Sequence, residues 1–147
     1  MKYFEDFPQG SVYTSGSYAV TADNIIDFAR QFDPQPFHLD EDVANASLLG
    51  GLAASGWQTA VISMRLHCDS WLKDSAGLGS PGITEMKWLK PVLKGYAVRQ
   101  IVRIVNARLS LSRPGMGILE HETEMLNQHD DVVMTTRAVT LVASRGA

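Results

Sequence analysis

The chain has 147 residues, of which 45% are hydrophobic and 20% are charged, and its formal net charge is −3. This length suits one folding unit, so we predict a single domain over residues 1–147. No cluster of lysine or arginine forms the basic face that phosphate binding needs, which argues against a nucleic acid as partner. No stretch approaches the roughly 20 apolar residues of a membrane span, so we expect no membrane association.

The chain has one cysteine, Cys68, which rules out an internal disulfide and favours a reducing, cytoplasmic location. Cys68 follows His67 without the ligand spacing of a metal site, and we therefore predict no metal. The first eight residues contain acidic side chains and Pro8, where a signal peptide needs an apolar run.

The first half of the chain alternates short extended and helical patterns. Residues 12–20 mix Tyr and Val with Ser and Thr, which indicates a strand. Thr21 is a good N-cap for a helix over residues 22–31, and Pro34 predicts that this helix ends by Asp33. A short acidic helix is expected over residues 40–46.

A long helix is expected over residues 57–72, because its apolar residues recur at helical spacing. Such a helix would be largely buried, with these residues packed in the core. The positions concerned are Trp57, Ala60, Val61, Met64, Cys68, Trp71 and Leu72.

The second half of the chain changes to a period of two. Residues 83–91, 96–108, 118–127 and 132–144 read as four strands separated by turns. We expect His121, which alternates with glutamates, and His129, in a turn, to face solvent. The whole pattern predicts an α+β domain in which an antiparallel sheet wraps the long helix.

The residues that suggest chemistry lie between these halves. Asp33 and His38 are five positions apart on a segment that Pro34 and Pro36 keep out of helix, and Gly56 follows at the start of the long helix. A carboxylate and an imidazole can handle a proton or a water, while N–H groups at a helix start can hold a developing oxyanion. The simpler alternatives are a turn aspartate, a structural histidine and a glycine chosen for backbone shape.

Three blocks of the chain resemble the MaoC-like dehydratases, a hot-dog-fold family that includes the (R)-specific enoyl-CoA hydratases. They are residues 33–40 (DPQPFHLD), 51–56 (GLAASG) and 88–95 (WLKPVLKG). The resemblance implies reversible hydration of a trans-2-enoyl thioester, with Asp33, His38 and Gly56 as catalytic residues. We also expect substrate contacts from Gly51, Ser55 and Trp57.

The resemblance further implies a homodimer or a dimer of dimers. The substrate would be an acyl-CoA or an acyl-carrier-protein thioester, without a metal or redox cofactor. One departure is Met64, which stands where many (R)-specific hydratases have a serine, and this suggests another branch or a different acyl group.

Two alternative functions remain open from the sequence. An acyl-CoA thioesterase would place a catalytic carboxylate on the long helix, which offers only Asp69 near its far end. A non-catalytic acyl-CoA-binding subunit of a hetero-oligomer would be expected to lack one dyad residue, and both Asp33 and His38 are present.

Overall fold

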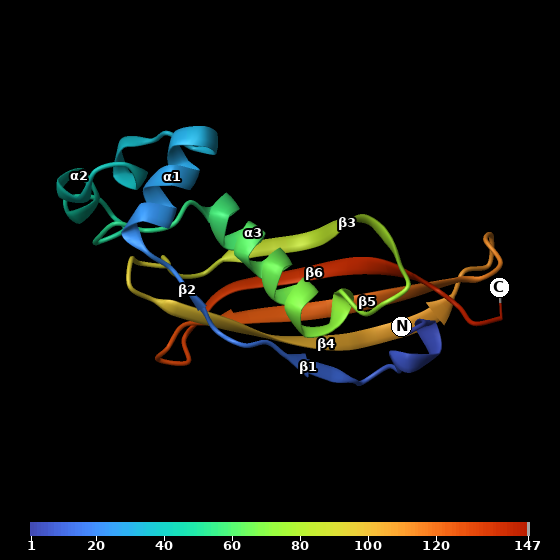
Figure 1. Cartoon of the computed structure of the whole chain (residues 1–147). Helices are drawn as coiled ribbons and strands as arrows, with labels where there is room; N and C mark the ends of the chain where they lie inside the picture. The colour runs from blue at the N-terminus through green and yellow to red at the C-terminus, as the bar shows by residue number, and fades with distance from the viewer. Residues whose placement is uncertain (147) are drawn as a thin grey trace.

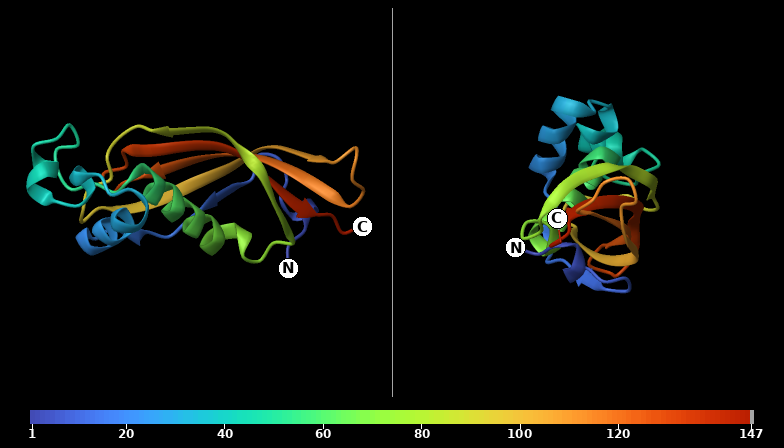
Figure 2. Two further views of the ribbon diagram at one scale, coloured as in Figure 1. Left: turned by 90° about the horizontal axis from the view of Figure 1, so that it is seen from above. Right: turned by 90° about the vertical axis from the view of Figure 1, so that its right-hand side faces the viewer.

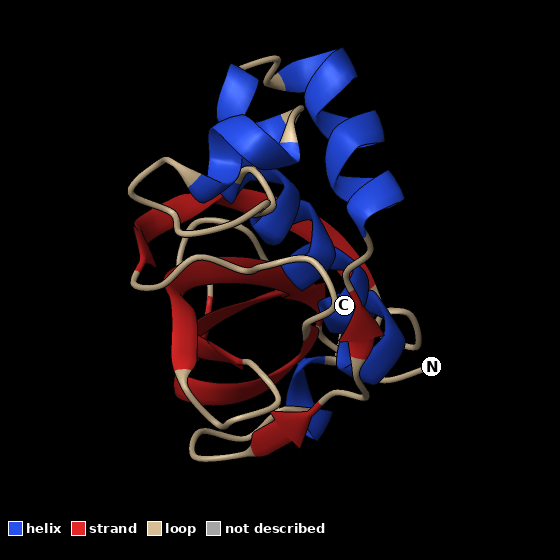
Figure 3. Ribbon diagram, turned by 90° about the vertical axis from the view of Figure 1, so that its left-hand side faces the viewer, coloured by secondary structure: helices blue, strands red, loops and turns tan. Residues whose placement is uncertain are grey.

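The computed structural model describes residues 1–146, in which an antiparallel sheet curls around one long helix (Figures 1 and 3). The sheet has six strands in the order β1-β4-β5-β6-β3, and β2 pairs separately with β4. The strands are β1 (Val12–Thr14), β2 (Tyr18–Ala19), β3 (Gly77–Trp88), β4 (Ala97–Leu109), β5 (Met116–Leu126) and β6 (Val132–Ala143). The α+β class expected from the sequence is confirmed.

The helices occupy one face and one end of this sheet. They are α1 (Ala22–Phe32), α2 (Glu41–Asn45) and α3 (Gly56–His67), with a π-helical turn at Cys68–Leu72 and 3-10 turns at Phe4–Asp6 and Pro36–His38. Figures 1 and 2 show α1 and α2 at one end of the sheet, with both chain termini near the other. No helix in residues 1–146 is long and apolar enough to cross a membrane.

Local sequence signals set the ends of α1 as predicted. The Thr21 side chain accepts a hydrogen bond from the Asn24 N–H at 3.1 Å, and the helix stops at Phe32, before Asp33 and Pro34. Two other boundaries differ from expectation. The strand predicted over residues 12–20 is divided into β1 and β2, and β3 begins at Gly77 rather than at Ile83. The glycine-rich start of β3 pairs with β6 through several register shifts, which hides its period-two pattern.

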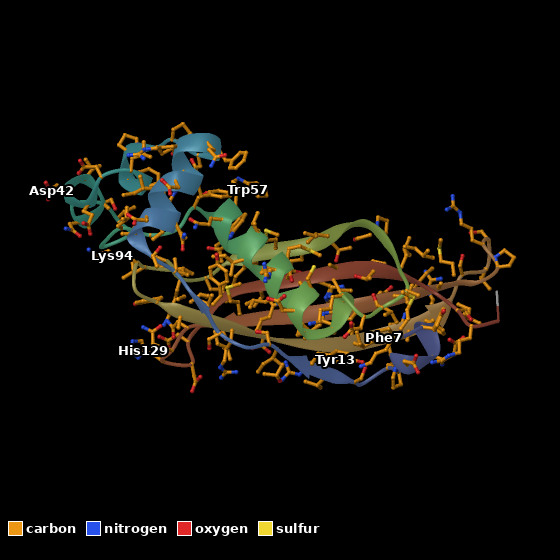
Figure 4. The ribbon with its side chains drawn as sticks, in the orientation of Figure 1. Phe7, Tyr13, Asp42, Trp57, Lys94 and His129 are labelled. Carbon is orange, nitrogen blue, oxygen red and sulfur yellow. The ribbon has the colours of Figure 1, made fainter. Side chains whose placement is uncertain are left out.

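The prediction that the apolar positions of α3 form the core was wrong for three residues. Trp57, Val61 and Met64 are 61%, 57% and 51% exposed. Figure 4 shows Trp57 projecting from the start of the helix. The face turned toward the sheet instead buries a mixed set of side chains: Gln58, Thr59, Ile62, Ser63, Leu66 and His67.

One polar side chain of this mixed face, Ser63, finds its partner on β4. The Ser63 hydroxyl donates to Gln100 Oε1 at 2.7 Å, and Gln100 Nε2 donates back to the Ser63 carbonyl at 3.1 Å. Both residues are buried. A buried polar pair that satisfies itself avoids most of the desolvation penalty, so hydrophobic periodicity alone could not identify the inward face.

A second correction concerns His121 on β5. It was expected to face solvent, but it is only 4% exposed, because it lies on the same inward face as Leu119 and Met125. It packs edge-on against Trp71, with ring centroids 5.3 Å apart. The prediction for His129 is confirmed, since this residue is exposed in the β5–β6 turn (Figure 4).

Candidate active site

Asp33 lies immediately after α1, where its N–H donates to the Ala29 carbonyl at 2.9 Å. Its carboxylate accepts two short hydrogen bonds, from the Ser55 hydroxyl to Oδ2 and from the Gln35 amide to Oδ1, each at 2.6 Å. The side chain is 16% exposed. Asp33 is therefore held in a fixed orientation while part of its carboxylate stays accessible.

These contacts keep Asp33 ionised. The hydrogen bond from Ser55 lowers the pKa of the Asp33 carboxyl below its usual value, and the hydrogen bond from Gln35 acts in the same direction. Partial burial opposes the change without reversing it. At neutral pH Asp33 is thus a carboxylate that can accept a proton from a bound water.

His38 is buried at the end of the turn Pro36–His38. Its Nδ1 lies 2.8 Å from the Ala53 carbonyl oxygen, and because a carbonyl only accepts, Nδ1 must carry the proton. In the neutral ring, Nε2 then has a free lone pair. Nε2 is 3.4 Å from Asp33 Oδ2, so one water can reach both atoms.

Gly56 opens α3 beside this pair. Ser55 caps the helix by accepting the Trp57 N–H at 3.3 Å, and within residues 1–146 the Gly56 N–H has no hydrogen-bond partner. The Gly56 carbonyl accepts the Trp88 indole N–H at 2.9 Å. A Cβ at Gly56 would lie 2.8 Å from Trp88 Cε2, so a larger residue would displace the indole.

A cleft of about 440 Å³ unites most of these groups. Asp33, His38, Gly56 and Trp57 line it, together with Gln35, Thr59, Trp88, Leu89 and Lys90 among others. Ser55 reaches the cleft through its hydrogen bond to Asp33. Gly51 does not line the cleft, since it lies beside Leu93 and Asn45.

Two residues of the cleft were not singled out from the sequence. Gln35 lies inside the DPQPFHLD block and Trp88 begins the third block, so both belonged to the recognised motifs. Their roles depend on contacts to Asp33 and to the Gly56 carbonyl, and spacing along the chain contains no sign of either contact.

Comparison with known proteins assigns the chain to a family. Residues 4–122 match the family described as MaoC like domain. The chain belongs to the MaoC-like dehydratases. Its hot-dog fold, with an antiparallel sheet around the 17-residue helix that α3 and the following π-helical turn form together, is therefore the one expected from the sequence.

Individual relatives agree with this family assignment. A MaoC-like dehydratase from Rhodospirillum rubrum is 39% identical, with a TM-score of 0.91 and 99% of each chain covered. The uncharacterized protein YdeM of Bacillus subtilis (strain 168) is 30% identical over 126 residues, which are 86% of this chain and 88% of YdeM. The unliganded R-hydratase PhaJ1 from Pseudomonas aeruginosa is 16% identical and shares the fold with a TM-score of 0.79. The match covers 97% of this chain and 86% of the PhaJ1 chain.

Proposed function

We propose that this MaoC-like protein catalyses the reversible addition of water to a trans-2-enoyl thioester of CoA or acyl-carrier protein. The observation that carries the proposal is the meeting of an ionised Asp33, a His38 Nε2 lone pair and an unpartnered Gly56 N–H in one cleft. These are an acceptor pair for a water and a donor for a thioester oxygen.

The water is bound by the dyad. It donates one hydrogen to Asp33 and the other to His38 Nε2, which leaves an oxygen lone pair directed at C3 of the enoyl group. As the new C–O bond forms, one water proton passes to the Asp33 carboxylate, and this proton can exchange between Asp33 and His38 Nε2. The dyad then returns a proton to C2 on the same face, and the dehydration direction reverses these steps.

The thioester oxygen gains negative charge while C2 has enolate character. We assign the Gly56 N–H, at the positive end of α3, as the donor to that oxygen. The absence of a side chain at Gly56 leaves room for the Trp88 indole, which packs directly against this point of the backbone. Trp57 and Trp88, whose rings meet edge-on at 5.6 Å, form an apolar border beside this point.

Spectroscopy with purified protein tests the proposal. Conjugated trans-2-enoyl-CoAs of several lengths lose their ultraviolet absorbance when hydrated, and a separate thiol assay detects free CoA. Hydration without thiol release supports the proposal. Thiol release alone would favour a thioesterase. Acyl-CoA binding with neither reaction would favour the non-catalytic subunit.

A pH profile tests the role of Ser55 in positioning and ionising Asp33. Because the Ser55 hydroxyl lowers the Asp33 pKa, the Ser55→Ala variant should raise it. Activity needs ionised Asp33 and is lost as the pH falls through the folded-state pKa, so the acid limb of kcat/KM should move to higher pH. A loss of activity with an unchanged limb would contradict this role.

We also propose that the protein acts as a homodimer or a dimer of dimers. The outer face of α3 exposes Trp57, Val61 and Met64, and the neighbouring edge strand β3 exposes Ile83 and Trp88. One side of β3 has no strand partner among residues 1–146, so its backbone groups are free to pair with a second copy. An apolar surface joined to an open sheet edge is typical of an interface.

Light scattering after gel filtration tests this interface. The Val61→Glu variant should shift the protein toward monomer, because it places a charge in the centre of the apolar surface. Leu111→Glu is the matched control, since Leu111 is fully exposed between β4 and β5 and lies outside this surface. A Val61→Glu protein with the wild-type mass would refute the assignment.

A further inference from the structure

A second cavity, of about 390 Å³, lies between α3 and strands β3, β5 and β6. It follows the dyad cleft along the helix, because Thr59 lines the cleft and the next residue, Ala60, lines this cavity. It also follows the cleft along β3, where Trp88 lines the cleft and Met86 lines the cavity.

Most of the cavity is apolar, and its sides include Met64, Ile83, Met86 and Met134. Among the residues that the structure describes, no lysine, arginine, aspartate or glutamate lines it. His67 and His121 also line it, with ring centroids 5.5 Å apart, as do the hydroxyl-bearing residues Ser63, Ser75, Ser80, Thr136 and Thr140. His67 is at the end of α3, about 16 Å from Gly56 at the helical rise per residue.

The protonation of His67 follows from its neighbour. Trp71 donates its indole N–H to His67 Nδ1 at 2.9 Å, and since an indole can only donate, Nδ1 is unprotonated. Burial and, to a smaller extent, the neighbouring His121 lower the pKa of His67 to about 3, so the ring is neutral near pH 7. The single ring proton is therefore on Nε2.

This Nε2–H group is an unused donor. It has no hydrogen-bond partner within residues 1–146, although His67 is only 8% exposed and lines the cavity. His121 is neutral too, since burial lowers its pKa to about 4. Its Nε2 lies 2.9 Å from the Thr140 hydroxyl, and its buried Nδ1 has no hydrogen-bond partner in the described part of the chain.

Resting on the function proposed above, we propose that this cavity receives the distal part of the acyl group, with the His67 Nε2–H donating to an uncharged oxygen on it. Such an oxygen is a hydroxyl or an oxo group. A plain hydrocarbon chain would displace water from the donor and leave it unpaired. A carboxylate would enter an apolar cavity without a cationic partner.

Binding of saturated acyl-CoAs tests the proposal, because they lack the double bond that hydration needs. Calorimetry compares each chain length with its counterpart carrying a terminal hydroxyl. At the length that reaches His67, the hydroxylated compound should bind about tenfold more tightly. This preference should disappear in His67→Leu and persist in His129→Leu, which replaces an exposed histidine in the β5–β6 turn. Equal binding at every length, or a preference retained by His67→Leu, would overturn the proposal.

Two further measurements cover other outcomes. His67→Gln keeps an acceptor for Trp71 and a donor, so part of the preference should survive. If His67→Leu fails to fold, nitrogen-15 NMR of the wild type replaces it, and the His67 Nε2–H signal should shift with the hydroxylated ligand only. Hydration of plain enoyl-CoAs without a hydroxyl preference would overturn this inference alone, whereas a preference without hydration would overturn only the proposed reaction.

Discussion

Replacing Asp33 by asparagine should lower the rate of enoyl-thioester hydration by about 10²–10⁴-fold, the usual contribution of a positioned acid–base group. Asparagine has nearly the same shape but cannot take a proton from water. Its amide can still accept the hydrogen bond that Ser55 now gives to Asp33 Oδ2, so the local fold should persist. Ultraviolet absorbance of the conjugated thioester measures the rate, and circular dichroism and gel filtration verify fold and assembly.

The matched control is Asp27→Asn. Asp27 lies on the same helix, α1, but its carboxylate is largely exposed and pairs with Arg30 at 3.6 Å. Exposed pairs of this kind contribute little, so rate and stability should stay near wild type. If Asp33→Asn retained wild-type hydration, Asp33 would not be the base, and the His38 Nε2 lone pair would be the remaining acceptor.

Acid should destabilise the fold strongly because of His67 and His121. Their folded-state pKa values are about 3 and about 4, against a usual value of 6.5. Below pH 6.5 the unfolded chain binds protons that the folded protein does not, so the free energy of unfolding falls as the pH decreases toward 4. Each histidine should remove roughly 2 kcal/mol between pH 7 and pH 5.

Urea unfolding at pH 7 and pH 5, at one fixed protein concentration, measures this effect. The His121→Gln variant should show about half the wild-type loss, because one of the two buried titrating rings is absent. His129→Gln should behave like wild type, since His129 is exposed. An equal loss in all three proteins would show that other groups, such as the acidic side chains, cause the acid sensitivity.

Local patterns predicted the elements well where the signal is itself local. Thr21 and Pro34 set the ends of α1, and the period of two located β4, β5 and β6 to within a few residues. The start of β3 could not be placed in this way. Its glycines give no alternation, and their pairing with β6 is a contact between distant parts of the chain.

The candidate site shows the same division. The motif blocks identified Asp33, His38 and Gly56, and the structure places all three on one cleft. The partner of each atom was not predictable, because Ser55 is 22 positions from Asp33 and Trp88 is 32 positions from Gly56. Ser55 was expected to contact substrate, yet its hydroxyl binds the carboxylate of Asp33.

The sequence by itself determined the α+β class, the family and the residue types of the dyad, because these depend on periodicity and on short motifs. Only the tertiary structure decided which face of α3 is buried and where His121 points. Pairing of Ser63 with Gln100 lets a polar face turn inward, which leaves Val61 and Met64 outside. Burial of a polar group depends on partners brought from other strands, and a pattern along one segment contains no information about them.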